Sequence, residues 1–223
     1  MKFSIVIPTL NESGLIDSTI RASQAAGADE IIVCDGGSSD TTVSIAEGLG
    51  CRVIETELGR GRQLHAGALA ANGDIFVFVH ADTLLGTACL DQIKACLPRL
   101  DRLARWGCFR QQIRLAGRRY RWLESGNAWR ASKRGYVYGD QAMWIHRNLY
   151  KDVGGFAEVP LMEDVLISET LRKRKPPVLL PGPVSIPGRH WEKRGVIRTT
   201  IRNWSLFLRY RMGTPPAVLA KRY

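Results

Sequence analysis

Long apolar runs are absent from this sequence. No window approaches the roughly 18 apolar residues that a membrane-spanning helix needs. The first apolar stretch, residues 3–7, is followed by Pro8, Asn11 and Glu12, and it is too short for a secretory signal peptide. We therefore expect a cytoplasmic protein, and we leave open a peripheral contact with the inner face of the membrane.

Cysteine pairs with the spacing of a metal site or a disulfide framework are also missing. The five cysteines are scattered between positions 34 and 108, and we expect them to be reduced thiols. Internal repeats, a recognisable nucleic-acid-binding motif and an early lysine-bearing glycine-rich phosphate loop are absent as well. These absences argue against a nucleic-acid partner and against nucleotidyl transfer. The length of 223 residues predicts one domain, residues 1–223.

Basic residues are plentiful but unevenly distributed. Residues 1–97 contain six Lys or Arg and twelve Asp or Glu, a net charge of −6. Residues 98–134 contain eleven and two, and residues 189–223 contain nine and one, net charges of +9 and +8. This division predicts a nucleotide-binding half, residues 1–97, and an anion-facing half, residues 98–223. Solvated helix faces are the alternative explanation, and a non-catalytic basic anion-binding protein is the alternative function.

Alternating strand and helix patterns fill the first hundred residues. This order predicts an α/β fold with a mostly parallel central sheet and helices on both faces. The expected strands are residues 3–7, 30–34, 51–54 and 75–79, and the expected helices are 13–25, 40–48 with Asp40 as N-cap, and 62–71. In the second half we expect strands at 106–115 and 138–145, helices at 118–130, 162–174 and 195–212, and an extended proline-rich stretch at 176–187.

The most informative stretch is residues 75–83. Five apolar residues without alternation predict a strand that is buried on both faces, and the run ends abruptly at His80 and Asp82. Ligands of open α/β sheets gather at the carboxyl ends of such strands. A carboxylate at this point can hold a divalent cation against a diphosphate. The alternative is an aspartate that caps the next helix.

Two polar turns follow neighbouring strands of the predicted sheet. Residues 7–12 read Ile-Pro-Thr-Leu-Asn-Glu, and residues 34–40 read Cys-Asp-Gly-Gly-Ser-Ser-Asp. One ligand could touch both turns, because the carboxyl ends of parallel strands meet at one edge. The carboxylate of Asp35 can accept hydrogen bonds from a base or a ribose hydroxyl. An Asp-Gly-Gly sequence by itself indicates no more than a turn.

Taken together, these motifs resemble the family-2 glycosyltransferases, which use the GT-A fold. The two turns resemble the opening motifs of that family, and Gly59-Arg60-Gly61-Arg62 is similar to its basic helix entry. His80-Ala81-Asp82 occupies the place of its metal-binding Asp-x-Asp motif, Met162-Glu163-Asp164 resembles its acceptor-side acidic pair, and Arg189-His190-Trp191 is similar to a late basic motif. The element His80-Ala81-Asp82-Thr83 most resembles a compact bacterial subgroup that is associated with arsenosugar biosynthesis.

The resemblance implies a donor site for a nucleoside-diphosphate sugar in residues 1–97, an acceptor-binding half in residues 98–223 that includes the C-terminal amphipathic helix, and a Mn²⁺ or Mg²⁺ cofactor. Asp82 would ligate the metal, and His190 is a second candidate ligand. His80 departs from the motif, and we expect it to pack or to contact ribose. The donor-binding residues would be Pro8, Leu10, Glu12, Asp35, Arg62 and Ala81, and the diphosphate-binding residues would be Arg189 and Arg194.

The resemblance also implies a metal-dependent inverting glycosyltransferase that moves the sugar to an acceptor hydroxyl. Asp164 would be the catalytic base, with helix capping as the alternative role. The acceptor, a small molecule or a lipid-linked one, would contact Glu163, Asp140 and Trp191. A membrane-associated polyprenyl-phosphate glycosyltransferase is an alternative, because residues 196–211 mix arginines with Trp, Phe and Leu. Packing of that helix on the core is the other explanation.

A homodimer is also left open. Four tryptophans in the region 106–144 could form an interface or belong to the core.

Overall fold

The computed structural model describes residues 1–220, except for the side chains of residues 190, 193 and 194. One eight-stranded sheet runs through it in the order β3-β2-β1-β4-β7-β6-β8-β5. The strands are β1 (Phe3–Thr9), β2 (Glu30–Asp35), β3 (Arg52–Glu55), β4 (Ile75–Phe78), β5 (Leu84–Leu85), β6 (Trp106–Ile113), β7 (Trp144–His146) and β8 (Val178–Ile186). Strands β1 to β4 are parallel, and β7 joins them to β6 by antiparallel pairing on both sides. The mostly parallel sheet confirms the predicted fold class.

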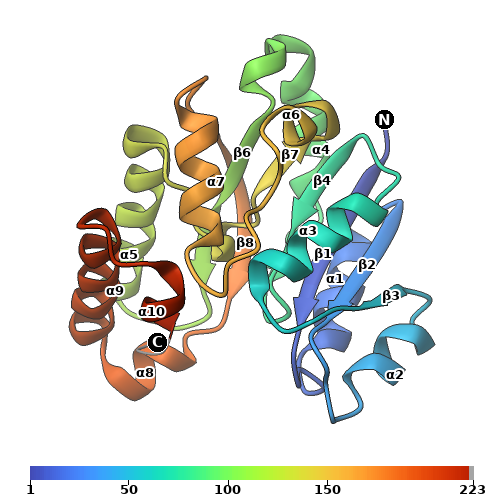
Figure 1. The fold of residues 1–223 in the computed structure, drawn as a ribbon, viewed down its shortest axis with the longest axis horizontal. Coiled ribbons are helices and arrows are strands. Elements are labelled where there is room, and N and C mark those ends of the chain that lie inside the picture. Colours follow the sequence, from blue (N-terminus) through green and yellow to red (C-terminus); the bar gives the residue numbers. More distant parts are fainter. Residues whose placement is uncertain (221–223) are drawn as a thin grey trace.

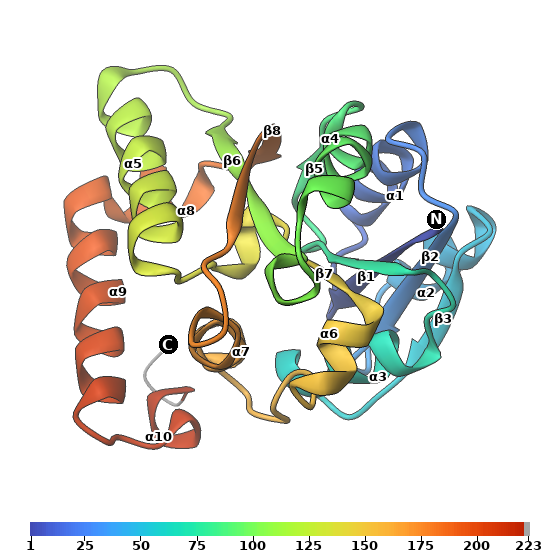
Figure 2. The ribbon, with the colours of Figure 1, turned by 90° about the horizontal axis from the view of Figure 1, so that it is seen from above.

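Helices cover both faces of this sheet, as Figures 1 and 2 show. Alternate residues of the central strands explain this arrangement: Ile5 and Ile7 pack with α1, α2 and α4, whereas Val6 packs with α3, α6 and α7. The helices are α1 (Ile16–Ala25), α2 (Thr42–Gly48), α3 (Arg60–Ala70), α4 (Cys89–Cys96), α5 (Arg118–Trp129), α6 (Arg147–Asp152), α7 (Glu163–Arg172), α8 (Arg189–Arg194), α9 (Val196–Arg211) and α10 (Pro216–Ala220).

Most predicted elements are present with shifted ends, but the strand expected at residues 138–145 is largely wrong. A 3₁₀ turn spans Gly139–Gln141, and the strand is limited to Trp144–His146. Two features prevent residues 138–143 from continuing the predicted strand. The backbone of Ala142 has a φ of 46°, and the amide of Gly139 donates to the carboxylate of Asp164 instead of to a neighbouring strand.

The four tryptophans of region 106–144 divide between core and surface. Trp106 and Trp144 are fully buried, whereas Trp122 and Trp129 of α5 are exposed. The proline-rich stretch is extended as predicted and forms β8. The helix expected at 195–212 is present as α9, and a short helix, α10, follows it. Within residues 1–220, no helix has the length and apolar character required to cross a bilayer.

Candidate functional site

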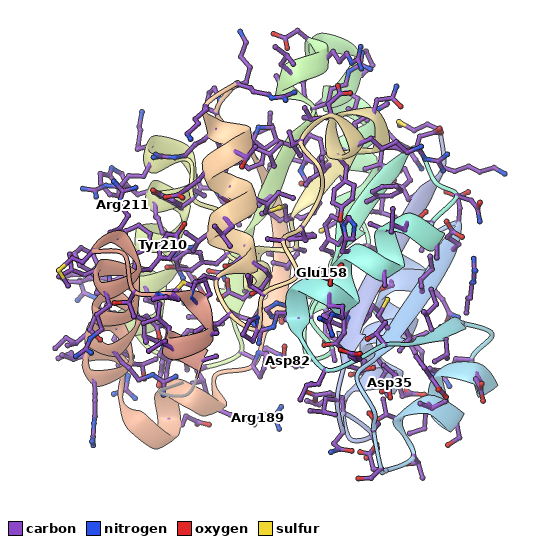
Figure 3. All side chains as sticks on the ribbon, in the orientation of Figure 1. Asp35, Asp82, Glu158, Arg189, Tyr210 and Arg211 are labelled. Atoms are coloured by element: carbon purple, nitrogen blue, oxygen red, sulfur yellow. The ribbon has the colours of Figure 1, made fainter. Side chains whose placement is uncertain are left out.

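A cleft of about 670 Å³ opens where the carboxyl ends of β1 and β4 meet the second half of the chain. The first half contributes the turn after β1 and the residues after β4. The second half contributes the 138–140 turn, the start of α7, and one side of α8 and α9. Asp35, Asp82 and Arg189 lie at the same end of the molecule in Figure 3, where β1, β2 and β4 end. The cleft therefore lies where a ligand of an open α/β sheet is expected.

The carboxylates around Asp82 influence one another across this cleft. Burial raises the pKa of Glu12, and the carboxylate of Asp82 raises it further. Burial also raises the pKa of Asp140, and the carboxylates of Asp164 and Asp82 add to this shift. One oxygen of Asp140, Oδ1, is buried without a hydrogen-bond partner in the described structure. A cation in the cleft would relieve this accumulation of negative charge.

His80 is buried in the wall of the cleft and lies against the backbone of Gly139. A Cβ atom at position 139 would lie 2.2 Å from Nε2 of His80, so this close approach requires glycine. Burial lowers the pKa of His80 to about 3, and the guanidinium of Arg60 acts in the same direction. The imidazole is therefore neutral at neutral pH, and its Nε2 has no hydrogen-bond partner in the described structure. This packing agrees with the expectation that His80 packs, while a ribose contact stays a prediction.

Asp164 is the second residue of α7 and faces the cleft. Its Oδ2 accepts a hydrogen bond from the amide of Gly139 at 3.0 Å, and its Oδ1 accepts one from the amide of Val165 at 2.7 Å. These bonds fix the carboxylate beside the 138–140 turn. The contact with Val165 also fits the capping role that the sequence left open, and one carboxylate can serve both purposes.

Glu163 is almost completely buried beside Asp164. Its Oε1 lies 3.5 Å from Nη1 of Arg60. Burial raises the pKa of Glu163 to about 7, the carboxylate of Asp164 contributes to the rise, and Arg60 opposes it. Glu163 lines a smaller side pocket with Asp164 instead of the main cleft.

Asp35 lies outside the lining of the cleft and holds its own turn together. Its carboxylate accepts hydrogen bonds from Thr9 Oγ1 at 3.1 Å, Gly37 N at 2.9 Å, Ser38 N at 2.7 Å and Ser38 Oγ at 2.5 Å. Burial alone would raise the pKa of Asp35, but these hydrogen bonds outweigh burial and lower it. All four acceptor positions are occupied, so a base or ribose would have to replace one of these four donors.

The two arginines at the start of α3 have different surroundings. Arg60 lines the cleft, whereas Arg62 does not and forms ion pairs with Glu57 and Glu158. The basic helix entry therefore places Arg60, and not Arg62, in the wall of the cleft. The sequence signal was present in Gly59-Arg60-Gly61-Arg62, but the orientation of each arginine depends on how α3 packs on the sheet.

The remaining predicted site residues divide into three groups. Pro8, Leu10, Glu12 and Ala81 line the cleft from the first half, and Asp140 and Trp191 line it from the second. Arg189 is exposed, and its charge lowers the pKa of Glu12 against the effect of burial. The side chains of His190 and Arg194 are outside the described residues.

Sequence reasoning missed several cleft residues of the second half. Tyr138 precedes the 3₁₀ turn, and Thr199, Arg202 and Asn203 lie on one side of α9. Their spacing of three and four residues is a helical signal, but it does not indicate which side of α9 faces the cleft.

Backbone strain is concentrated around the cleft. Within residues 1–220, the non-glycine residues with positive φ are Asn11, Ala142 and Met162, at 54°, 46° and 68°. Asn11 lies between two cleft-lining residues, and Ala142 and Met162 lie two positions from Asp140 and Asp164. Such strain is common at functional sites, where it positions side chains that relaxed backbone would not.

Among the described residues, no three His, Cys, Asp or Glu side chains gather as the ligands of one metal ion. The carboxylate of Asp82 is accessible at the cleft, with a 3.5 Å contact from the hydroxyl of Thr83. Mg²⁺ and Mn²⁺ can bind through one carboxylate when phosphate oxygens and water complete the shell. The carboxylate of Asp82 therefore suits a cation that binds together with a diphosphate. The described residues do not by themselves form a complete set of metal ligands.

The fold and the cleft define the class of α/β proteins that bind a ligand at the carboxyl edge of a mostly parallel sheet. Residues 4–140, more than half of the chain, match Glycosyl transferase family 2. The chain therefore belongs to glycosyl transferase family 2, and its fold is of the GT-A type. This membership favours an enzyme over the non-catalytic anion-binding alternative.

Two curated relatives match part of the chain. Glucosyl-3-phosphoglycerate synthase of Mycobacterium tuberculosis H37Rv is 36% identical over 93 residues, which is 36% of this chain and 29% of that protein. The PGL/p-HBAD biosynthesis glycosyltransferase of Mycobacterium bovis BCG is 36% identical over 92 residues, 37% of this chain and 36% of the relative. The matched regions thus span about a third of these relatives.

Solved structures with the same fold include the following two. S. aureus TarS residues 1–349, in complex with UDP-GlcNAc, superpose with a TM-score of 0.64 at 18% identity, over 84% of this chain and 58% of that one. Glucosyl-3-phosphoglycerate synthase from M. tuberculosis, in complex with Mn²⁺, UDP and glucosyl-3-phosphoglycerate, gives 0.58 at 23% identity, over 83% and 70%.

Proposed function

We propose that this protein is a metal-dependent inverting glycosyltransferase that moves a sugar from a nucleoside-diphosphate sugar to an acceptor hydroxyl. The observation that carries the proposal is the convergence of Asp82 and Asp164 on one cleft from opposite halves of the chain. A donor that enters past the β1 turn would bring its diphosphate to Asp82, and an acceptor would approach from the side of α7 and α9.

Asp82 would hold the Mg²⁺ or Mn²⁺ ion, and His190 remains a candidate second ligand. The ion would offset negative charge on the departing nucleoside diphosphate. Arg189 and Arg194 are proposed to contact the same diphosphate, since cations stabilise phosphate charge.

Asp164 is the proposed general base. The acceptor oxygen forms a bond to the anomeric carbon while the bond from that carbon to the diphosphate oxygen breaks. The proton of the acceptor hydroxyl passes to the carboxylate of Asp164, and the electron pair of the broken bond stays on the diphosphate. Attack from the face opposite the leaving group inverts the anomeric centre.

The other predicted roles are those that the family resemblance implies. Pro8, Leu10, Glu12 and Ala81 would line the donor site, and Asp35 and Arg62 remain predicted donor contacts although neither lines the cleft. Asp140 and Trp191 would contact the acceptor in the cleft, and Glu163 would do so from its side pocket. The narrower resemblance to the arsenosugar-associated subgroup stays a prediction that depends on His80-Ala81-Asp82-Thr83.

Calorimetric titration with nucleoside diphosphates, with and without Mn²⁺, tests the donor site. UDP is the first ligand to examine, since the two structural relatives were solved with uridine nucleotides. We expect binding that is strengthened by Mn²⁺ and lost in Asp82→Ala. Asp17→Ala, which removes an exposed carboxylate of α1, is the matched control and should bind normally. If no nucleotide binds under either condition, the proposed donor site is wrong.

A further inference from the structure

The outer side of α9 carries an exposed apolar stripe. Ile197, Ile201, Trp204, Leu208 and the following Met212 are between 59% and 75% exposed. Their spacing of four, three, four and four residues places them on one face of the helix. A continuous apolar face of this length normally packs against another surface, and exposed patches of this kind mark interaction sites.

The opposite side of α9 already supplies the contacts that hold the helix on the protein. Leu206 is buried with Leu161 and Leu219, and Phe207 packs edge-on against Tyr136. Tyr210 on that side donates a hydrogen bond to the carboxylate of Glu169 in α7, and Arg211, which lies next to the stripe, donates a second one; both residues are labelled in Figure 3. The stripe is therefore a second apolar face, and it is not needed to attach α9 to the described core.

The surroundings of the stripe are strongly basic. Arg198 and Arg209 are exposed beside it, and residues 193–223 contain no Asp or Glu. Figures 1 and 2 place α5 beside α9 at the same edge of the molecule. Residues 118–134, which comprise α5 and the turn after it, contain six Lys or Arg and one Glu, and Trp122 and Trp129 are exposed there.

We propose that the outer face of α9, with the basic residues of α5 beside it, binds the surface of an anionic phospholipid membrane. Aliphatic side chains such as Ile201 and Leu208 would enter the boundary between head groups and acyl chains, and Trp204 would lie at the head-group level. The arginines would contact lipid phosphates. The helix lies in the plane of the interface and does not span the bilayer.

Charge and apolar character favour an anionic membrane at this surface over a second copy of the chain or a nucleic acid. A second copy of the chain would bring two arginine-rich surfaces together without carboxylates to pair with them, which is unfavourable. A nucleic acid would satisfy the arginines but would offer no aliphatic phase in which to bury Ile201 and Leu208. An anionic bilayer satisfies both the charge and the apolar stripe.

This surface is separate from the donor site, so its function does not depend on the proposed transfer reaction. Thr199, Arg202 and Asn203, on the other side of α9, line the cleft. Membrane binding would therefore hold the cleft roughly one helix diameter, about 10 Å, from the head groups. This location suits an acceptor that is delivered at the membrane surface.

Vesicle sedimentation tests the proposal. We expect the protein to bind vesicles of equal parts phosphatidylcholine and phosphatidylglycerol, to bind phosphatidylcholine alone weakly, and to bind less as the salt concentration rises. The double variant Ile201→Ser with Trp204→Ser should bind roughly tenfold or more weakly, because burial of two large apolar side chains is lost. Leu69→Ser, which changes an equally exposed leucine of α3, should bind like the unaltered protein.

Charge is tested separately with Arg198→Gln and Arg209→Gln together. This variant should lose the preference for anionic vesicles, whereas Arg21→Gln on α1 should keep it. Circular dichroism checks that each variant is folded, and UDP titration reports on the donor site independently. The proposal is overturned if the unaltered protein binds neither vesicle, if the Ile201 and Trp204 substitutions leave binding unchanged, or if they disrupt a stable dimer that does not bind lipid.

Discussion

Individual carboxylates in this protein have their properties set by residues that are distant in sequence. Glu163 and Asp164 are neighbours at the start of α7, yet one is buried against Arg60 and the other faces the cleft. Arg60 is about a hundred positions away in the chain, so the difference between the two carboxylates cannot be read from their own motif. Because of this difference, Glu163 and Asp164 are tested by separate experiments.

Replacement of the proposed base should abolish transfer. Asp164→Asn keeps the shape of the side chain and its hydrogen bond with Gly139 but cannot accept the proton, so we expect turnover to fall by about 10²- to 10⁴-fold. The donor hydrolysis or transfer rate is the measurement, with nucleotide affinity as the check on binding. Asp152→Asn, on the surface of α6, should have normal activity. Normal turnover in Asp164→Asn would assign that residue to helix capping alone.

Burial of Glu163 predicts a specific dependence of stability on pH. Its pKa is about 7 in the folded protein and about 4.5 when the chain unfolds, so the folded state binds the extra proton between these values. The proton on Glu163 stabilises the folded state fully below pH 4.5, and this stabilisation is lost as the pH rises through 7. We expect Glu163→Gln to remove this loss, which is roughly 1 to 3 kcal/mol between pH 5 and 7.

Urea unfolding of the original protein and Glu163→Gln at the two pH values measures that difference. Other groups titrate in both proteins and cancel in the comparison. Equal changes in the free energy of unfolding would mean that Glu163 is ionised in the folded state.

At the scale of single elements, helix α3 shows how close packing positions the site. Its start contributes Arg60 to the cleft, and its middle lies against β1 and β2. A Cβ atom on Gly67 would lie 2.4 Å from Cγ1 of Val6 and 2.5 Å from Sγ of Cys34. The helix approaches the sheet this closely because residue 67 has no side chain.

Gly67→Ala should therefore destabilise the protein although alanine is the better helix former. Overpacking of this kind costs about 1 to 3 kcal/mol. Gly126→Ala in α5 is the matched control, because open space surrounds that position, and it should raise stability by up to about 1 kcal/mol. Thermal unfolding of the two variants measures the contrast. A stabilised Gly67→Ala would show that α3 can move away from the sheet without loss.

At the scale of the whole molecule, one sheet connects the acidic first half to the basic second half. Strand β7 pairs with β4 on one side and with β6 on the other, so the hydrogen-bonded ladder is continuous from β3 to β5. The cleft lies across this connection, with Asp82 contributed by one half and Asp164 by the other. A single domain over residues 1–223 remains our prediction for this arrangement.

Cooperative unfolding tests that prediction. All six tryptophans lie at position 106 or later, so their fluorescence reports on the second half, whereas far-ultraviolet circular dichroism reports on helices of both halves. If the sheet unfolds as one unit, both signals should change at the same urea concentration. Two separated transitions would divide the chain into independent units.

The sequence alone determined the class of fold and the main positions of chemistry. Apolar runs that end in Asp82 and in the turn after residue 7 predict strands whose carboxyl ends form a site, since strand periodicity and turn chemistry are local properties. The order of these motifs also indicated the family. The predicted strand at 138–145 was largely wrong, because a contact with Asp164 and the left-handed backbone of Ala142 override local propensity.

Only the tertiary structure decided which residues share the cleft and in what state. Arg60 faces the cleft, whereas Arg62 pairs with surface carboxylates. The carboxylate of Asp35 is occupied by hydrogen bonds within the protein, and His80 is buried as a neutral imidazole. The tertiary structure also chose which face of α9 packs on the protein and left the stripe through Trp204 exposed. Burial and long-range contacts fix these outcomes, and neither is encoded in the spacing of neighbouring residues.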